Sequence, residues 1–496
     1  MLFNKIILVA LISFYTMQSF AQNESVKSNN YLKGVLLDTE TKEPLPYANI
    51  VIQRINRGSI TNEMGEFTID TTGLILSDSI RFLYLGYQSI SIDVNQLTLN
   101  EEVYLTEDIQ NLNKVFVYGS PPSAQEIIEK VVENRVRNYT LNTQVKKVFY
   151  RTRNDTEVEN LDLDYKKSSI SVVDENVLKE LQNNTPKHSS SYIDFMGNLY
   201  YSGKESDTLK YKLIPVKTVE LKEKSITELN ETDKALANVF SDVEENEYWK
   251  LQTGIFGVKM DEAEIDTVQN ERNTSSTLSG LKKSLQYSKL TSKHDWGFLY
   301  STNKYNYELA GGTTVNNEDV YVINFTPKEG GVYEGRVYVS VETYALIKAD
   351  YQYAKDKVGL DIQFLGIGYK EDFFSGSILF ERIDSTYQLK YCSKKVGYKS
   401  KIDRTISMVK KKERFLFDKK LNQLKFGLFV KSNVDNSFEL LVLEQNTIPY
   451  TEFLEIKEEE THYIQYVNQF DDALWKGHSI IEPTQKMREY KKQELK

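Results

Sequence analysis

Side chains that could perform chemistry are few in this sequence, and their spacing does not gather them into a familiar site. The chain has four histidines: His188, His294, His462 and His478. A zinc peptidase needs two histidines, or a histidine and a glutamate, on one face of a helix, where they hold the metal that activates water. His478 and Glu482 lie four residues apart, but the flanking Gly477 and Pro483 disfavour a helix. The histidines therefore predict no metal site.

Three other groups of residues attract attention and are better explained by structure. Asp261, Glu262, Glu264 and Asp266 are acidic, but no turn glycine follows at calcium-loop spacing, so we interpret them as a solvated face. The stretch 197–205 has Gly and Lys like a phosphate loop, but its spacing is one residue too long and Glu205 stands where a magnesium-binding hydroxyl belongs. The single cysteine, Cys392, excludes an internal disulfide and lies in a strand-like run that predicts burial. We therefore expect no catalytic residue, no cofactor and no metal.

Composition excludes another class of function. The 496 residues carry a net charge of −9 and the isoelectric point is near 5.4, which gives no electrostatic footprint for nucleic acid. One local basic run, residues 410–414, is short and isolated, and we interpret it as a solvated strand end or loop. Nucleic acid is not an expected partner.

Residues 32–105 predict a small antiparallel β-sandwich that organises the front of the chain. Short runs with alternating apolar residues are separated by turn residues, as half-buried strands require. Gly65 can supply the positive φ of a tight reversal between two of these runs, and Gly86 breaks another pair. Several short strands at this spacing indicate a sandwich.

The motifs of this stretch resemble a known family. They are Gly34-x-Val/Leu-x-Asp38, Pro44-Leu45-Pro46-x-Ala48-Asn49, Gly58-x-x-Thr61-Asn62-x-x-Gly65-x-Phe67 and Gly86-Tyr87. The pattern is similar to the carboxypeptidase-regulatory-like domain, a transthyretin-like sandwich found in envelope proteins of gram-negative bacteria. The resemblance implies an accessory module without chemistry of its own.

The first residues predict export. Lys5 gives a positive start, residues 6–12 an apolar core, and Ser19-Phe20-Ala21 a small-x-small cleavage site. We interpret residues 1–21 as a signal peptide rather than a membrane span, because the apolar run is too short. No later segment approaches eighteen consecutive apolar residues, so the mature chain is expected to have no transmembrane segment.

A joint and a helix should follow the sandwich. Residues 112–119 form a β-type stretch that ends at two prolines. Ser123 and Glu126 then have capping-box spacing, and the apolar residues after them form one stripe, which predicts an amphipathic helix of about fifteen residues. Its expected role is packing against the following sheet.

The region from 146 to 303 gives weaker signals. Residues 148–152 are strand-like, 175–182 and 234–246 look helical, and the aromatic stretch 189–201 fits either a strand or a binding loop. Residues 261–279 are polar and have no large apolar residue between Val268 and Leu278, which predicts an exposed or disordered loop.

From residue 304 onward the pattern predicts a twisted antiparallel meander. Strand-like runs at 305–311, 320–325, 336–341, 345–353 and 360–369 are joined by short turns. The phrases Phe325-x-Pro327, Tyr333-x-Gly335-x-Val337-Tyr338-Val339 and Thr343-Tyr344-Ala345 are similar to the curved half-barrel of periplasmic lipoprotein carriers, which implies an apolar cradle for a lipid chain. A packed sheet crossed by a helix is the simpler interpretation.

The tail from 455 to 496 is expected to turn helical. Tyr463, Tyr466, Val467 and Phe470 would share one helix face, and Pro483 would precede a charged terminal helix. Trp475 is the expected anchor of the tail on the body of the protein.

Together these patterns predict a mostly β (α+β) protein. Its parts are an N-terminal sandwich of the seven-strand type, an amphipathic helix linker, and a C-terminal curved antiparallel sheet with packing helices. The expected domains are 1–21 (signal peptide), 31–106 (sandwich), 107–145 (linker strand and helix), 146–303 (mixed α/β) and 304–496 (meander with C-terminal helices).

The function expected from the sequence is not enzymatic. We expect an exported accessory protein of the cell envelope, in the periplasm or associated with the outer membrane, that binds an envelope or outer-membrane protein through its sandwich and C-terminal sheet. The alternative is a periplasmic carrier of a lipid or other apolar ligand in a half-barrel-like C-terminal sheet.

Overall fold

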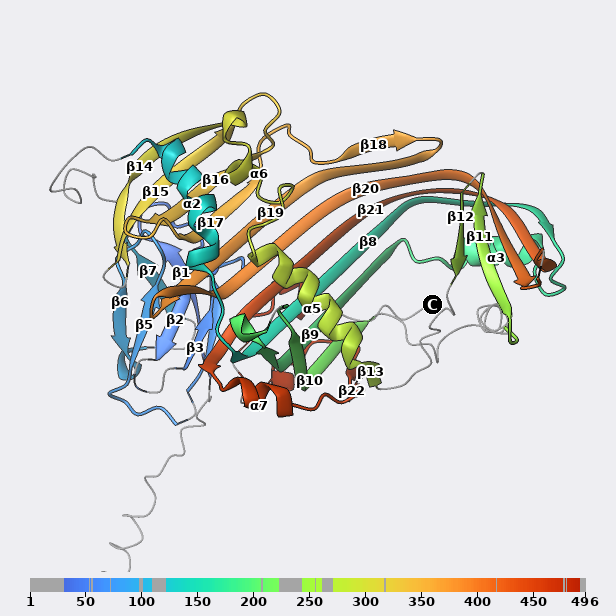
Figure 1. The fold of residues 1–496 in the computed structure, drawn as a ribbon. Coiled ribbons are helices and arrows are strands. Elements are labelled where there is room, and N and C mark those ends of the chain that lie inside the picture. The colour runs from blue at the N-terminus through green and yellow to red at the C-terminus, as the bar shows by residue number, and fades with distance from the viewer. Residues whose placement is uncertain are drawn as a thin grey trace, which may run out of the picture.

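The fold of a computed structural model consists of a small sandwich and one very large curved sheet (Figure 1). The structure describes residues 31–490, apart from positions 53, 55–56, 72, 98–100, 109–121, 207, 223–242, 255, 261–270, 316–317, 416, 476–477 and 479. The predicted signal peptide, the linker strand 112–119 and most of the expected helix 234–246 lie outside these residues.

The described residues of the N-terminal sandwich form seven strands in two sheets, as the sequence predicts. One sheet has the order β4-β1-β7 and the other β3-β2-β5-β6. The strands are β1 (Tyr31–Asp38), β2 (Asn49–Ile52), β3 (Arg57–Ile60), β4 (Glu66–Asp70), β5 (Ser79–Leu83), β6 (Ile90–Asp93) and β7 (Glu101–Leu105). Both sheets turn their alternate apolar residues inward to a shared core.

The turn before β4 shows why its residue types are needed. Gly65 adopts a φ of +70°, and a Cβ at that position would lie 2.5 Å from the carbonyl oxygen of Leu36. The Asn62 side chain accepts hydrogen bonds from the backbone N–H groups of Met64 (2.9 Å) and Glu66 (3.0 Å). These contacts fix the reversal that places β4 beside β1.

Helix α2 (Ala124–Asn138) forms where the capping-box spacing predicts it. The Glu126 side chain accepts from the Ser123 backbone N–H at 2.8 Å, and Ser123 Oγ accepts from the Glu126 N–H at 3.3 Å. Ile127, Ile128 and Val131 are fully buried in the main hydrophobic core. The helix therefore packs against the large sheet, as expected for an amphipathic helix.

The large sheet is antiparallel along nearly all of its length and has the order β14-β15-β16-β17-β19-β20-β21-β8-β9-β10-β23. The pairing of β10 with β23 is parallel. The expected segments 146–303 and 304–496 both contribute strands to it. Its strands are β8 (Gln144–Ser168), β9 (His188–Tyr201), β10 (Tyr211–Lys222), β14 (Tyr305–Val315), β15 (Glu318–Pro327), β16 (Tyr333–Ser340), β17 (Leu346–Tyr353), β19 (Ile367–Ile383), β20 (Thr386–Lys412), β21 (Lys419–Thr447) and β23 (Gln465–Val467).

One face of this sheet, which we call the helix face, carries α5 (Thr274–Ser288) and α6 (Gly297–Tyr300). Leu281 and Trp296 are fully buried there, and the ring of Phe298 stacks on Phe325 with centroids 4.2 Å apart. The side chains beneath α5 and α6 are thus closely packed aromatic and aliphatic groups, and this part of the face is a core.

Helix α5 corrects the prediction of a loop over 261–279. Residues 261–270 lie outside the described residues, β13 (Glu271–Asn273) is a short strand, and α5 begins at Thr274. The Asn273 side chain caps the helix by accepting from the Ser275 N–H at 2.8 Å, and Leu278, Leu281 and Leu285 form its buried stripe. The polar first turn hid this helix, because capping residues and loop residues are the same types.

The adjacent strands β19, β20, β21 and β8 continue past the helices and form what we call the arm (Figure 1). Strands β20 and β21 have 27 and 29 residues, which corresponds to roughly 90 Å at about 3.3 Å per residue. The arm consists of the distal parts of β8, β19, β20 and β21. It is joined by β18 (Asp361–Phe364), β11 (Glu247–Thr253), β12 (Phe256–Met260) and α3 (Glu175–Asn184), and α3 lies where the sequence predicts a helix.

The opposite face, which we call the sandwich face, supports the sandwich and the tail. Ile60 of β3 and Trp475 of the tail share a buried cluster with Phe149 of β8 and Tyr391 of β20. Tyr47 stacks on Tyr391 with ring centroids 4.8 Å apart. The prediction that Trp475 anchors the tail is confirmed, since its side chain is 2% exposed.

The tail itself corrects another prediction. Tyr463, Tyr466 and Val467 lie in β22 (Thr461–Tyr463) and β23 rather than on one helix face. The helical elements of the described tail are short: α7 (Tyr450–Glu455), η7 (Asp472–Trp475) and α8 (Gln485–Arg488). β23 finds a partner in the edge strand β10, and this tertiary hydrogen bonding overrides the weak helical pattern.

Candidate functional site

The predicted chemistry-bearing residues stay apart in the fold. His188 is exposed beside Glu157, His462 lies against Thr274, and His478 contacts the Trp475 ring. His294 has the most polar surroundings, with Asp295 at 3.6 Å and Glu371 at 3.7 Å, and Asp295 raises its pKa. Across the described residues, no three His, Cys, Asp or Glu side chains gather as a metal site would require.

Cys392 lies in β20 and is completely buried, as the sequence predicts. Burial holds the pKa of its thiol far above the ordinary value, so the thiol stays protonated and unreactive.

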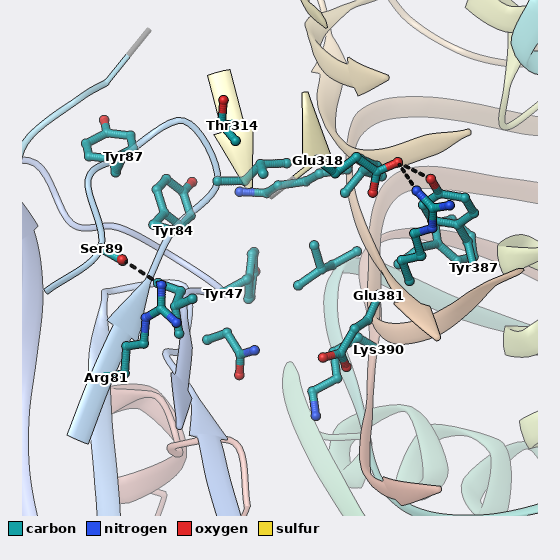
Figure 2. Close-up of a pocket in the computed structure, with 18 of the residues that line it drawn as sticks. Tyr47, Arg81, Tyr84, Tyr87, Ser89, Thr314, Glu318, Glu381, Tyr387 and Lys390 are labelled. Carbon is teal, nitrogen blue, oxygen red and sulfur yellow. Dashed lines mark hydrogen bonds and ion pairs between the residues drawn. The ribbon is translucent and has the colours of Figure 1, made fainter. Parts of the chain in front are cut away.

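A cleft of about 640 Å³ separates the sandwich from the large sheet (Figure 2). The sandwich contributes β5 and the loop after it, and the sheet contributes β15, β17, β19 and β20. Its polar lining includes Arg81, Glu318, Lys348, Glu381 and Lys390. These residues come from distant parts of the chain, and no local motif in the sequence marks them.

Two of the charged groups of this cleft, Glu318 and Lys348, have polar or charged partners. Glu318 accepts hydrogen bonds from Tyr387 Oη and from Ser340 Oγ, and Arg382 lies 3.4 Å from the same carboxylate. Lys348 is 2% exposed, pairs with Asp350 at 3.0 Å, and places its ammonium 3.7 Å from the centroid of the Tyr84 ring.

The environment of Lys390 differs from that of Lys348. Burial lowers its pKa, while Glu381 opposes that effect. The lining has four cations (Arg81, Lys348, Arg382 and Lys390) and four acids (Asp108, Glu318, Glu381 and Asp384), so its formal charges balance. We therefore interpret this cleft as part of the interface between the sandwich and the large sheet.

A second surface lies on the helix face of the arm, beyond the packed core. Phe364, Ile367, Ile402, Val430 and Leu161 stand side by side in one row across β18, β19, β20, β21 and β8. Because side chains alternate along a strand, this row shares a face with Cys392, which lies in the core under α5.

Neighbouring rows extend this surface, which we call the apolar strip. It comprises Val158, Leu161, Leu163, Ile362, Phe364, Ile367, Tyr369, Tyr398, Ile402, Leu428, Val430 and Val434. Phe364 is 60% exposed, Ile362 47% and Ile367 42%, and the members on β8, β20 and β21 are partly exposed. A strip of this size is larger than the single apolar residues that dot ordinary surfaces.

The other side of the same strands is mainly polar, with Phe429 among its members. Lys401 pairs in register with Lys431 and Asn160, and Asp403 with Phe429 and Asp162. The arm is therefore amphipathic across its thickness, as expected of a sheet with one face covered. The sequence predicts one strand over 360–369, but the structure divides this run into β18 and the start of β19 by a turn at Leu365 and Gly366, both at positive φ. The strip is not visible in the sequence, because it exists only once five strands are in register.

The structure also changes the position expected for an apolar cradle. Where α5 and α6 cross the sheet, the helix face is filled by buried side chains such as Trp296 and Tyr333. The open apolar surface lies further along, on the arm.

Comparisons with known proteins give one family and a set of distant structures. No curated protein matches the chain. The MucA/MucB complex of Pseudomonas aeruginosa is similar at 9% identity, covering 64% of this chain and 93% of that chain with a TM-score of 0.18. A putative outer membrane lipoprotein-sorting protein domain from Vibrio parahaemolyticus is similar at 10% identity, covering 67% and 97% with a TM-score of 0.19.

The family match falls on the sandwich. Residues 32–117 match the CarboxypepD_reg-like domain, in agreement with the motifs around Gly34, Ala48 and Gly86. The described helices include none that is long and apolar enough to cross a membrane.

The family match and the motifs together show that the chain carries a carboxypeptidase-regulatory-like domain at residues 32–117.

Proposed function

We propose that this protein is a non-enzymatic, exported accessory protein of the cell envelope that binds a partner protein on the apolar strip. The observation that carries the proposal is the continuous row from Phe364 to Leu161, whose side chains are apolar and open on the helix face of five adjacent strands. Export to the periplasm or outer membrane is supported by the sequence pattern of residues 1–21.

The occupant that fits best is an amphipathic helix of the partner. A free acyl chain needs a pocket that covers most of its surface, whereas the apolar strip is open and contacts an occupant on one side. An amphipathic helix needs burial on one side because its other face is polar.

The packing of helix α5 supports this choice of occupant. It lies on the same sheet with Leu278, Leu281 and Leu285 facing the core, while Lys282 and Lys283 point to solvent. A partner helix on the apolar strip would repeat this packing further along the same strands. The alternative of a lipid or other apolar ligand remains the competing outcome of the experiment below.

The sandwich plays a supporting part in this proposal. The faces that carry Tyr47, Tyr84 and Ile60 are occupied by the large sheet, so these faces are not free for an envelope partner. The other loops of the sandwich are left as the second surface that would contact the partner.

Site-specific photo-crosslinking tests the proposal. A photoreactive phenylalanine analogue at Phe364, in the full chain in its own envelope, should yield a protein adduct whose crosslinked peptide has an apolar stripe at helical spacing. The same analogue at Phe429, on the polar side of the arm, is the matched control and should give little of that adduct. A lipid adduct at Phe364 would favour the carrier, and equal yields at both sites would contradict a specific surface.

A further inference from the structure

The hairpin that joins β20 to β21 forms the distal end of the arm and exposes two aromatic side chains. Phe415 is 100% exposed and Phe417 is 85% exposed. The hairpin lies at the opposite end of the molecule from the sandwich (Figure 1). These are the most exposed large apolar residues of the described chain, and neither packs on the small hydrophobic cluster beneath the hairpin.

The base of this hairpin is firmly held. β11 pairs with β20 from Glu247 opposite Lys412 to Gln252 opposite Ser407. Lys410 and Glu247 form an ion pair at 2.9 Å with side chains 7% and 5% exposed, and Trp249 is buried beside Leu424. The exposed aromatic residues therefore lie next to strand ends that are held in register.

Positive charge surrounds the two aromatic residues. Residues 410–420 contain six Lys and Arg against Glu413 and Asp418. Lys410 and Lys412 pair with Glu244 and Glu247, so the positive charge near the rings comes mainly from Arg414, Lys419 and Lys420. Arg414, Lys419 and Lys420 are exposed at the tip itself. The basic run that looked like an ordinary strand end thus borders an exposed apolar apex.

We propose that this hairpin tip inserts into the interface of a membrane that carries anionic lipid headgroups. Phe415 and Phe417 would enter the boundary between headgroups and acyl chains, where aromatic rings gain most from leaving water. Arg414, Lys419 and Lys420 would lie among the headgroups, with their aliphatic stems beside the rings and their charges at the phosphates.

A lipid surface fits this tip better than a protein partner does. A stable protein interface buries roughly 800 Å² on each side, and two side chains at the apex of one hairpin offer much less than that. Shallow insertion of a few aromatic residues, assisted by basic neighbours, is sufficient for reversible attachment to a bilayer. The inference does not depend on the occupant of the apolar strip.

Vesicle flotation of the full chain without residues 1–21 tests the proposal. The probe is vesicles of phosphatidylcholine with added phosphatidylglycerol, compared with phosphatidylcholine alone. We expect binding to the anionic vesicles, and a loss of about tenfold or more in the double variant Phe415→Ser with Phe417→Ser. The matched control is Ile75→Ser with Leu76→Ser, which removes two exposed apolar residues from the sandwich at the other end of the molecule.

Charge and insertion can be measured separately. Lys419→Gln with Lys420→Gln should weaken binding to anionic vesicles and reduce its salt dependence. In Phe415→Trp, the new indole should shift its emission to the blue on binding and be quenched by brominated acyl chains, whereas the native Trp249, Trp296 and Trp475 are at most 4% exposed.

Three results would overturn the proposal. They are no flotation of the unmodified chain, unchanged flotation of the Phe415 and Phe417 double variant, and no emission shift of the new indole on vesicles that do bind. A tip that captured a protein but no vesicle would likewise assign it to a protein interface.

Discussion

At the scale of single residues, the joint between sandwich and sheet contains a buried network of charges. Arg151 forms a two-pronged ion pair with Asp194 at 2.7 and 2.8 Å and also donates to the carbonyl oxygens of Ile481 and Glu482. Glu439 lies in the same network and accepts from Tyr391 Oη at 3.2 Å. The arginine thus connects the tail to the sheet. Glu439 lies opposite Arg151 in the register of β21 and β8, while the guanidinium is paired with Asp194.

Glu439 should make stability depend on pH near neutrality. Burial raises the pKa of its carboxyl to about 7, with Arg151 opposing and Glu63 and Asp194 adding to the rise. The folded state therefore binds a proton that the unfolded state releases above its ordinary pKa of 4.5, so stability falls as pH rises from about 4.5 to about 7.

We predict that Glu439→Gln stabilises the protein by on the order of 1–3 kcal/mol near pH 8 and changes little near pH 4. Urea unfolding at the two pH values measures the difference. Glu444→Gln is the control, since Glu444 lies on the same strand and is exposed, with 61% of its side chain accessible. A gain of the same size at both pH values would show that the effect is not protonation.

At the scale of elements, helices were predictable where a cap and a stripe coincide. Ser123 and Glu126 mark the start of α2 in the sequence as they do in the structure, whereas α5 begins with four Ser and Thr residues that resemble a loop. Strands from 305 to 353 were predictable because alternation is local. The run 360–369 was wrongly predicted as one strand, since a turn at Leu365 and Gly366 separates β18 from β19. The strand β23 was not, because its partner β10 lies some 245 residues earlier in the chain.

Loss of the α2 cap should be measurable. Ser123→Ala removes one acceptor and releases Glu126, so we expect about 1 kcal/mol of destabilisation. Ser123→Asp keeps an acceptor for the orphan N–H groups and should retain most of the stability. Chemical denaturation of the two variants checks this, and equal losses would show that the cap is not the cause.

At the scale of the whole molecule, sandwich and sheet should unfold as one unit. The buried cluster around Tyr391 joins the sandwich, the sheet and the tail, and the packed side chains continue from one to the next. The carboxypeptidase-regulatory-like domain therefore stabilises the sandwich face of the large sheet.

We expect Tyr391→Ala to separate this unit into two. The substitution removes the ring that stacks on Tyr47 and leaves a cavity at the joint, at a cost of about 3–5 kcal/mol. Calorimetry should then resolve an early transition for the sandwich, while the unmodified protein shows a single transition. Tyr398→Ala, on the apolar strip of the same strand, is the control and should keep the single transition.

The candidate surfaces were beyond the reach of the sequence for the same reason at every scale. The fold class followed from local alternation and from the motifs of the sandwich. The apolar strip depends on the register of five strands, and the joint depends on side chains such as Glu318 and Lys390 that the chain brings together from far apart. At the arm tip the sequence contains a basic run, and the structure adds that Phe415 and Phe417 beside this run are exposed.

The position of β8 in the middle of the large sheet has a consequence for how the chain folds. Gln144, at the start of β8, pairs with Thr447, at the end of β21. Strand β8 can therefore pair with β21 only when nearly the whole polypeptide is present. The pairs β8–β9 and β20–β21 join segments that are closer in sequence, so they can form earlier. Contacts so distant in sequence slow folding, and during the wait both hairpins present unpaired edges. The chain is thus exposed to aggregation until residue 447 is available for pairing, and we expect it to depend on a chaperone that shields β-strand edges.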